Sequence, residues 1–210
     1  RRHALGILRM LIEKELPLSL DKLIAIGTEE ESVVPGVKDA TEELKQFFHD
    51  RLRVMQKDQG FTAHEVESVI GSEPAILADV PKRLKAVHDF MSLPEAESLA
   101  AANKRIENIL KKNTLPLADA VDPALLTEKE EKDLYEAIRT LEPKLEADYK
   151  AGRYEDELRS LAPLKAPVDA FFDKVMVNAE DEALRRNRLT LLNELHKAMN
   201  QVAKLSCLAS

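Results

Sequence analysis

Residues 167–205 constrain the fold most, because they predict two helices joined by a short acidic turn at 178–181. Pro167 begins an apolar stretch, 168–177. The longer stretch after the turn carries regularly spaced apolar residues: Leu184, Leu191, Leu195, Met199 and Val202. Steps of three, four and seven place these side chains on one face of a helix. Such a face must be buried against other elements, so this segment predicts a packed helical core.

The rest of the chain shows the same helical periodicity. Helices are predicted at residues 2–16, 38–59, 63–71, 81–91, 94–112, 127–150 and 154–162, with a short apolar turn or helix at 20–26 and a glutamate-rich loop at 27–36. No segment alternates apolar and polar residues for more than a few positions, as a half-buried β-strand would. The sequence therefore predicts an all-α fold, a helical bundle.

Local signals refine this expectation. The helix at 2–16 is apolar around most of its circumference, so we expect it to be well buried. Gly60 is expected to end the helix at 38–59, and Thr62 and Glu65 have the spacing of a capping box for the next helix. Pro143 is expected to kink or restart the helix at 127–150.

Composition excludes several classes of protein. The 210 residues suffice for one or two domains, and no apolar run is long enough to predict a membrane span. The apolar stretch after Arg9 is too short for a signal peptide. Cys207 is the only cysteine, which excludes an internal disulfide and fits a cytoplasmic location. Because the chain opens on two arginines without a methionine, we expect a piece of a longer protein.

Two clusters of basic and amide side chains are candidate anion-binding sites, although the net charge is −7. The first consists of Asn103, Lys104, Arg105, Asn108, Lys111 and Lys112, and the second of Arg185, Arg186 and Asn187. Lysine and arginine bind phosphates, whereas amide and guanidinium groups also hydrogen-bond to the exposed edges of unpaired bases. Each cluster flanks an apolar stripe. Packing the stripes of 98–112 and 182–205 in one antiparallel bundle predicts that the clusters share an exposed side.

Each cluster also has a purely structural interpretation. The first could be a solvated helix face with Asn103 hydrogen-bonded internally. The arginines of the second could pair with the acidic side chains of Glu180, Asp181 and Glu182, and Arg188, four residues after Leu184, is expected to be structural. Phe171 and Phe172 could stack on a base, but we expect one in the core and the other in a helix–helix seam.

No catalytic or metal site is predicted. His49-Asp50 matches the metal-binding pair of HD phosphohydrolases, which leaves an independent hydrolase as a third possibility, but the other histidines lack a matching signature. The sequence has no glycine-rich phosphate loop, no G-x-S-x-G motif and no Cys-His pairing.

Five blocks, in order along the chain, resemble the C-terminal part of bacterial glycyl-tRNA synthetase β subunits. They are Arg1-Arg2-His3-Ala4-Leu5-Gly6 with Arg9; Asp50-Arg51-Leu52-Arg53 with Asp58-Gln59-Gly60; Arg83-Leu84-Lys85-Ala86-Val87; Ala100-Ala101-Ala102-Asn103-Lys104-Arg105 with Asn108-Ile109-Leu110; and Pro167-Val168-Asp169-Ala170-Phe171-Phe172-Asp173-Lys174-Val175-Met176-Val177 with Asn187-Arg188-Leu189. The chain departs from the family at 206–210, where Ser-Cys-Leu-Ala-Ser replaces a more apolar ending.

The resemblance implies a helical anticodon-binding domain of the arginyl-tRNA synthetase type, named for an Asp-Ala-Leu-Arg signature, at 98–208. Residues 1–97 would end the preceding helical body of the subunit. The family's enzyme is a cytoplasmic α2β2 heterotetramer that ligates glycine to its tRNA, with ATP and magnesium used at the α subunit. The partners implied are glycine tRNA and the α subunit, with no DNA, no membrane and no cofactor in this chain. The rival prediction is a non-catalytic helical scaffold that binds a protein partner.

Overall fold

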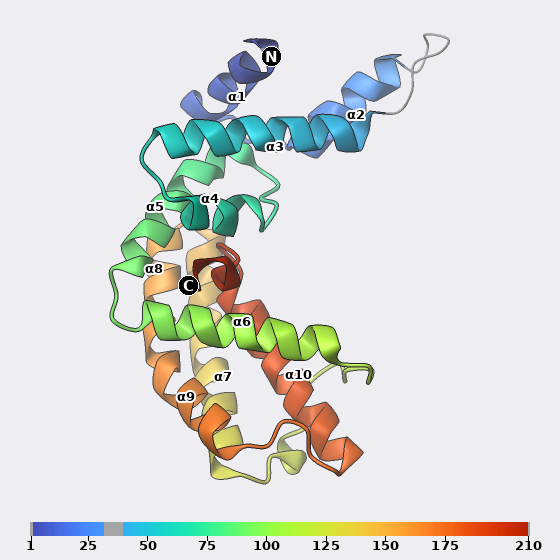
Figure 1. Cartoon of the computed structure of the whole chain (residues 1–210), viewed down its shortest axis with the longest axis vertical. Coiled ribbons are helices and arrows are strands. Elements are labelled where there is room, and N and C mark those ends of the chain that lie inside the picture. The colour runs from blue at the N-terminus through green and yellow to red at the C-terminus, as the bar shows by residue number, and fades with distance from the viewer. Residues whose placement is uncertain (1, 32–39, 210) are drawn as a thin grey trace. The chain divides into compact units, whose positions relative to one another are not determined.

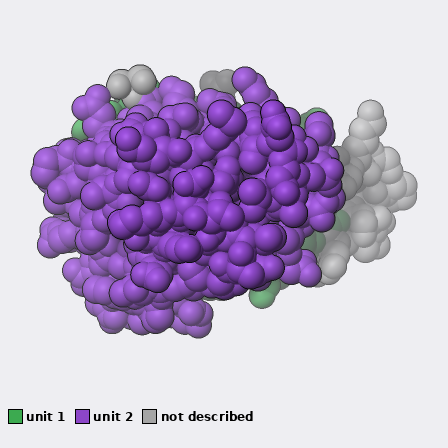
Figure 2. Space-filling model, turned by 90° about the horizontal axis from the view of Figure 1, so that it is seen from below, with its two compact units in different colours: residues 1–85 green, residues 86–210 purple. Residues whose placement is uncertain are grey.

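The computed structural model describes residues 2–31 and 40–209 and divides into two compact units, Arg1–Lys85 and Ala86–Ser210 (Figures 1 and 2). The described residues form helices, and the only β-type pairing among them is an isolated bridge between Ser19 and Ile76. The predicted all-α class is confirmed. The domain boundary predicted after residue 97 falls inside the second unit.

The first unit contains α1 (Arg2–Glu13), α2 (Leu20–Glu31), α3 (Thr41–Asp58), α4 (Ala63–Ile70), the 3-10 helix η1 (Leu77–Asp79) and the start of α5 (Val80–Met91). Helix α3 contacts α1, α2 and α4. The buried side chains of Leu8, Leu52, Val66 and Leu77 form the centre of this unit.

Two sequence expectations for this unit are wrong. Helix α1 buries only Ala4, Leu8 and Leu11, which share one face, and Met10 is 57% exposed. Its neighbours α3 and η1 therefore cover one face of a helix that also carries the polar residues Arg2, His3, Arg9 and Glu13. Helix α2 continues to Glu31 through the first part of the predicted loop at 27–36, and the rest of that loop lies outside the described residues.

The predicted boundaries around α4 are confirmed. Gly60 has a φ of +99°, a conformation that glycine adopts without strain, and it follows the last turn of α3. The Thr62 hydroxyl accepts a hydrogen bond from the Glu65 amide at 3.2 Å, and the Glu65 carboxylate accepts one from the Thr62 amide at 2.7 Å. This reciprocal pair is the predicted capping box.

The second unit consists of the end of α5 followed by α6 (Ala96–Lys112), η2 (Pro123–Leu125), α7 (Lys129–Lys150), α8 (Tyr154–Arg159), η3 (Ala162–Leu164), α9 (Lys165–Lys174), α10 (Glu182–Met199) and η4 (Leu205–Leu208). Helices α7 and α9 pack against each other in opposite directions, and α6 packs against α10 and crosses it (Figure 1). The predicted antiparallel arrangement therefore describes α7 and α9 but not α6.

The core of this unit contains both helices that carry the basic clusters. Leu99 and Ile106 of α6 and Leu191, Leu195 and Met199 of α10 are fully buried. The two helices contact each other, and α6 also packs against η4. The prediction that both helices contribute to one core is confirmed.

In this unit the predictions around Pro167 and Pro143 and for the end of α10 differ from the structure. Pro167 is the third residue of α9, where its missing N–H costs no hydrogen bond, so the helix begins before the proline rather than at it. Pro143 lies inside α7, which continues through it, so the alternative of a restarted helix is wrong. Gly152, with φ of +70°, follows α7. Helix α10 ends at Met199, before the predicted 205.

Candidate nucleic-acid interface

One face of α6 presents cations and an amide to solvent. Lys104, Arg105, Asn108 and Lys112 are exposed, and together with Ala101 and Ile109 they line a shallow depression of about 340 Å³. The Lys104 ammonium group donates to the Ala209 carbonyl at 3.4 Å, which anchors it beside the C-terminal segment. Because these residues recur every three or four positions, they form a row along the helix.

Arg105 is held over an aromatic ring. Its guanidinium carbon lies 4.2 Å from the centroid of the Phe172 ring on α9, a cation–π contact. Phe172 in turn meets Phe171 edge to face, at 5.6 Å between centroids, and Phe171 is fully buried. The predicted division of the two phenylalanines between core and helix seam is confirmed. The contact with Phe172 fixes the position of the Arg105 guanidinium within the row.

The predicted exposure of Asn103 is wrong. Its side chain is fully buried, and its amide nitrogen lies 3.9 Å from the Met199 sulfur. Asn103 follows Leu99 by four residues and precedes Ile106 by three, so it lies on the apolar stripe and faces α10. The structure therefore gives Asn103 the internal position of the alternative interpretation, and an RNA chain cannot reach it without unpacking this core.

Lys111 lies beside an acidic side chain. Its ammonium group is 2.8 Å from the Glu107 carboxylate, and Lys204 approaches the same carboxylate at 3.1 Å. Burial alone would raise the pKa of Glu107, but hydrogen bonds from Lys111, Ser206 and Lys204 outweigh it and lower the pKa to about 2. Glu107 is thus ionised at neutral pH and offsets part of the Lys111 charge.

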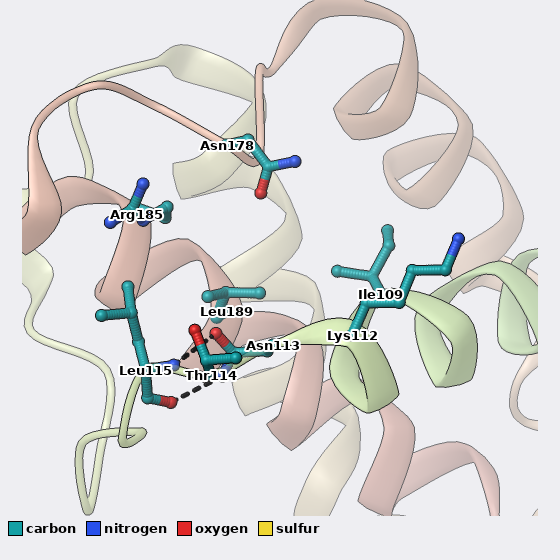
Figure 3. Close-up of a pocket in the computed structure, with 8 residues that line it drawn as sticks. All are labelled: Ile109, Lys112, Asn113, Thr114, Leu115, Asn178, Arg185 and Leu189. Atoms are coloured by element: carbon teal, nitrogen blue, oxygen red, sulfur yellow. Dashed lines mark hydrogen bonds between the residues drawn. The ribbon is translucent and has the colours of Figure 1, made fainter.

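A pocket of about 450 Å³ brings the two predicted clusters together (Figure 3). It is lined from α6, the connector after it, the loop before α10, and α10 itself: Ile109, Lys112, Asn113, Thr114, Leu115, Asn178, Arg185 and Leu189. Lys112 of the first cluster and Arg185 of the second lie to either side of Leu189 in this view. Lys112 and Arg185 thus line one pocket, whereas the shared exposed side expected for Lys104, Arg105 and Asn108 and the second cluster stays a prediction.

Six of these lining residues were absent from the predicted site: Ile109, Asn113, Thr114, Leu115, Asn178 and Leu189. Asn113, Thr114 and Leu115 directly follow α6, and the Asn113 amide both donates to the Leu115 carbonyl at 2.6 Å and accepts from the Leu115 amide at 3.0 Å. An asparagine after the last turn of a helix is a recognisable turn signal, but nothing local to Asn178 or Leu189 links them to α6.

The remaining second-cluster residues have mainly structural contacts. Arg186 pairs with Glu182 at 3.0 Å, as the alternative interpretation expected. Asn187 is 3% exposed, so its predicted exposure is wrong. Its amide donates to the Asp122 carbonyl at 3.0 Å and accepts from the Asp122 amide at 2.8 Å, because this position of α10 faces the connector 113–126.

Arg188 is structural, as predicted. It is 5% exposed and pairs with the fully buried Glu131 at 2.7 Å. It also donates to the Met176 carbonyl at 2.8 Å and to the Thr127 hydroxyl at 3.3 Å. This arginine therefore joins α10 to the start of α7 and to the loop after α9, the loop that carries Asn178.

These side chains can bind anions and the polar edges of bases. Across residues 2–31 and 40–209, no group of three or more His, Cys, Asp and Glu side chains could hold a metal ion. His49 is buried, and burial lowers its pKa. Within the same part of the chain, no helix is both long and apolar enough to cross a membrane.

Comparison with known proteins yields two family matches. Residues 99–206 match the family described as DALR anticodon binding domain, and residues 1–71 match the family described as Glycyl-tRNA synthetase beta subunit. The first match contains both predicted clusters and the pocket between them.

Individual relatives agree along the whole chain. The glycine–tRNA ligase beta subunit of Delftia acidovorans is 52% identical over 214 residues, and that of Dechloromonas aromatica is 50% identical over 210. The same-named protein of Nitrosomonas eutropha is 48% identical over 223 residues. Each alignment covers all of this chain, which spans about 30% of the length of these relatives. As its resemblance to glycyl-tRNA synthetase β subunits implies, the chain belongs to the DALR anticodon binding domain family.

Proposed function

We propose that the second unit binds the anticodon stem-loop of glycine tRNA, within the β subunit of a glycyl-tRNA synthetase. The observation that carries this proposal is the coincidence of the DALR family match with the row of exposed cations on α6. The chain as a whole is acidic, with a net charge of −7, so a basic row is a local feature directed at an anion.

The roles within the row follow from its chemistry. Lys104 and Lys112 are point charges suited to phosphates, whereas Arg105 and Asn108 can also hydrogen-bond to base edges. An anticodon loop offers both kinds of group, because its bases are unpaired and its backbone is folded. Duplex DNA offers base edges only in its grooves, and we propose no role in DNA binding.

The wider assembly is part of the same proposal. The β subunit would act in a cytoplasmic α2β2 enzyme, with glycine activation and transfer at the α subunit, where ATP and magnesium are used. This chain would then contribute recognition and no cofactor. Holding the anticodon end of the tRNA would help to position its acceptor end at an active site on another chain.

Binding to matched and altered anticodon stem-loops at two salt concentrations tests the proposal. Lys104→Ala should weaken both RNAs alike and reduce the salt slope by about 0.7–0.9. Arg105→Ala or Asn108→Ala should cost about 1–3 kcal/mol for the glycine anticodon and much less for another anticodon. Lys150→Ala, which removes an exposed lysine of α7 paired with Glu146, serves as the control. Wild-type affinity in all three α6 variants would refute the assignment of this row.

A scaffold that binds a protein partner is the second candidate, and one feature favours it. A groove of about 570 Å³ between α7 and η3 is lined by the apolar residues Ala137, Leu141, Pro163 and Leu164, with Asp133, Glu136, Thr140 and Lys144. Its partly acidic lining is unsuited to RNA. If the scaffold role were the main one, substitutions in this groove would abolish function and substitutions on α6 would not.

A further inference from the structure

The pocket between Lys112 and Arg185 differs from the rest of the basic face because it has an apolar floor. Leu189 is only 2% exposed, and the half-buried Ile109 and Leu115 complete the apolar part of the lining. A phosphate gains nothing from contact with such an apolar surface, whereas the flat face of a nucleobase can pack against it. The volume, about 450 Å³, is in the range of about 300–1,000 Å³ typical of small-molecule sites.

Arg185 is available to a ligand, because no carboxylate among the described residues pairs with it and two nearby acidic side chains are engaged elsewhere. Glu182 pairs with Arg186, and the Asp181 carboxylate accepts the Ala183 and Leu184 amides at the start of α10. The Arg185 Nε atom is buried and has no hydrogen-bond partner among the described residues. A buried donor without a partner is costly, so a ligand that supplies an acceptor would gain from this position.

The same holds for Lys112 and Asn178. Glu107 is engaged by Lys111 and Lys204, and in the described part of the chain no carboxylate pairs with Lys112. The exposed Asn178 amide makes no hydrogen bond to any described residue. It offers a donor and an acceptor side by side, the pattern that base edges complement. The Asn113 side-chain amide, by contrast, already donates to and accepts from the Leu115 backbone, and this pair stabilises the edge of the pocket.

We propose that this pocket binds one unstacked nucleotide of the RNA loop, with its base over Leu189, its base edge at Asn178, and an adjacent phosphate at Lys112 and Arg185. The proposal rests on the proposed function, because it takes the loop's nucleotide from the anticodon arm. It adds a base-reading site next to the α6 row, and Lys112 belongs to both. It also assigns a role to the loop 175–181, of which the sequence analysis predicted only 178–181 to be a turn.

The test is a thermodynamic cycle between single abasic positions in the RNA and substitutions in the pocket. The full chain is titrated with the glycine anticodon stem-loop and with versions lacking the base at each unpaired position in turn. For wild type, one abasic position should weaken binding by about 5- to 150-fold, as expected for loss of one base contact. In Asn178→Ala, the same abasic position should cost at least about threefold less.

Substitutions of Arg185 and Lys197, both on α10, distinguish a phosphate contact in the pocket from a general effect of positive charge on RNA binding. Arg185→Met should weaken intact and abasic RNAs by the same factor and lower the salt slope by about 0.7–0.9. Lys197→Met, which removes an exposed cation of α10 outside the pocket, should leave the abasic penalty at its wild-type value. Circular dichroism of each variant checks that it is folded.

The outcomes distinguish the two proposals. If wild type binds the glycine stem-loop but no abasic position couples to Asn178, the nucleotide site is refuted and anticodon binding stands. If wild type binds matched and altered stem-loops equally weakly, the proposed function fails, and the pocket loses its ligand with it.

Discussion

Arg188 is the side chain on which the arrangement of the second unit depends most. It is buried with Glu131 and contacts two further segments, so its charge is almost fully removed from water. Replacing both members of such a pair with apolar residues can leave the free energy of unfolding nearly unchanged. Removing only one partner, however, leaves a buried charge uncompensated.

Arg188→Ala is therefore expected to destabilise the second unit by about 3–5 kcal/mol. Urea unfolding should show this as a lower midpoint. The matched control is Arg159→Ala, whose ion pair with Glu155 is exposed and should be worth no more than about 1 kcal/mol. Equal effects of the two substitutions would contradict the structural role of Arg188.

Glu107 makes a pH-dependent contribution to stability. Its pKa in the folded protein, about 2, is below the ordinary value of 4.5, so its ionised form stabilises the fold above pH 4.5 and that contribution is lost as the pH falls towards 2. The stability advantage of wild type over Glu107→Gln should be about 1–3 kcal/mol at pH 6 and much smaller at pH 2.5. Urea titrations of both proteins at the two pH values measure it, and an advantage that is constant with pH would refute the assignment.

At the residue scale, the sequence predicted the exposure of lysine and arginine side chains in the two clusters more accurately than that of asparagine side chains. Lys104, Arg105, Lys112 and Arg185 lie at the surface or in a surface pocket, where a charge without a buried partner keeps its hydration. Asn103 and Asn187 are both buried, but only the Asn187 amide has hydrogen-bond partners for both its oxygen and its nitrogen, whereas the Asn103 oxygen has none among the described residues. Whether an asparagine faces solvent depends on which neighbour packs over it, and that neighbour is distant in sequence.

At the scale of elements, helix α10 acts as a polar clamp on the connector 113–126. Asn187 holds both backbone groups of Asp122, the Thr190 hydroxyl accepts the Ala118 amide at 3.1 Å, and the Glu194 carboxylate accepts the Val121 amide at 3.3 Å. These α10 residues recur at steps of three and four, on one face of the helix. A connector that looks irregular in sequence is thereby held to α10 at Ala118, Val121 and Asp122.

Asn187→Ala should loosen this connector. Loss of the paired hydrogen bonds is expected to cost about 1–2 kcal/mol and to speed amide hydrogen exchange at Asp122 and Val121 by at least about tenfold. Asn193→Ala, also on α10 but outside the clamp, should change neither. Unchanged exchange at Asp122 in the first variant would mean that the clamp does not order the connector.

Helix existence was predictable from the sequence, and helix ends were predictable only where capping chemistry marks them. Thr62 and Glu65 mark the start of α4 directly. The predicted start of α9 at Pro167 was wrong, because a proline is tolerated within the first turn of a helix. The predicted restart at Pro143 was also wrong, because packing supports a long helix that contains a proline. The crossing of α6 over α10 (Figure 1) depends on packing between distant segments, which periodicity alone does not specify.

At the scale of the whole molecule, we expect the isolated chain to bind tRNA without catalysing glycine activation or aminoacylation. The proposed active site lies on another chain, so the isolated chain should show no glycine-dependent ATP–pyrophosphate exchange and no aminoacylation. Adding purified α and full-length β subunits under the same conditions provides the positive control. Exchange activity in the isolated chain that survives repurification would contradict this division of labour.

The measurement that tests the central claim most directly is a nuclease and chemical footprint of the full chain on intact glycine tRNA. Anticodon binding predicts protection of the anticodon stem-loop and none at the acceptor end. It also predicts that the protection is lost in a Lys104→Ala, Lys112→Ala double variant that remains folded. Protection confined to the acceptor end, or a pattern shared equally with unrelated tRNAs, would contradict the account.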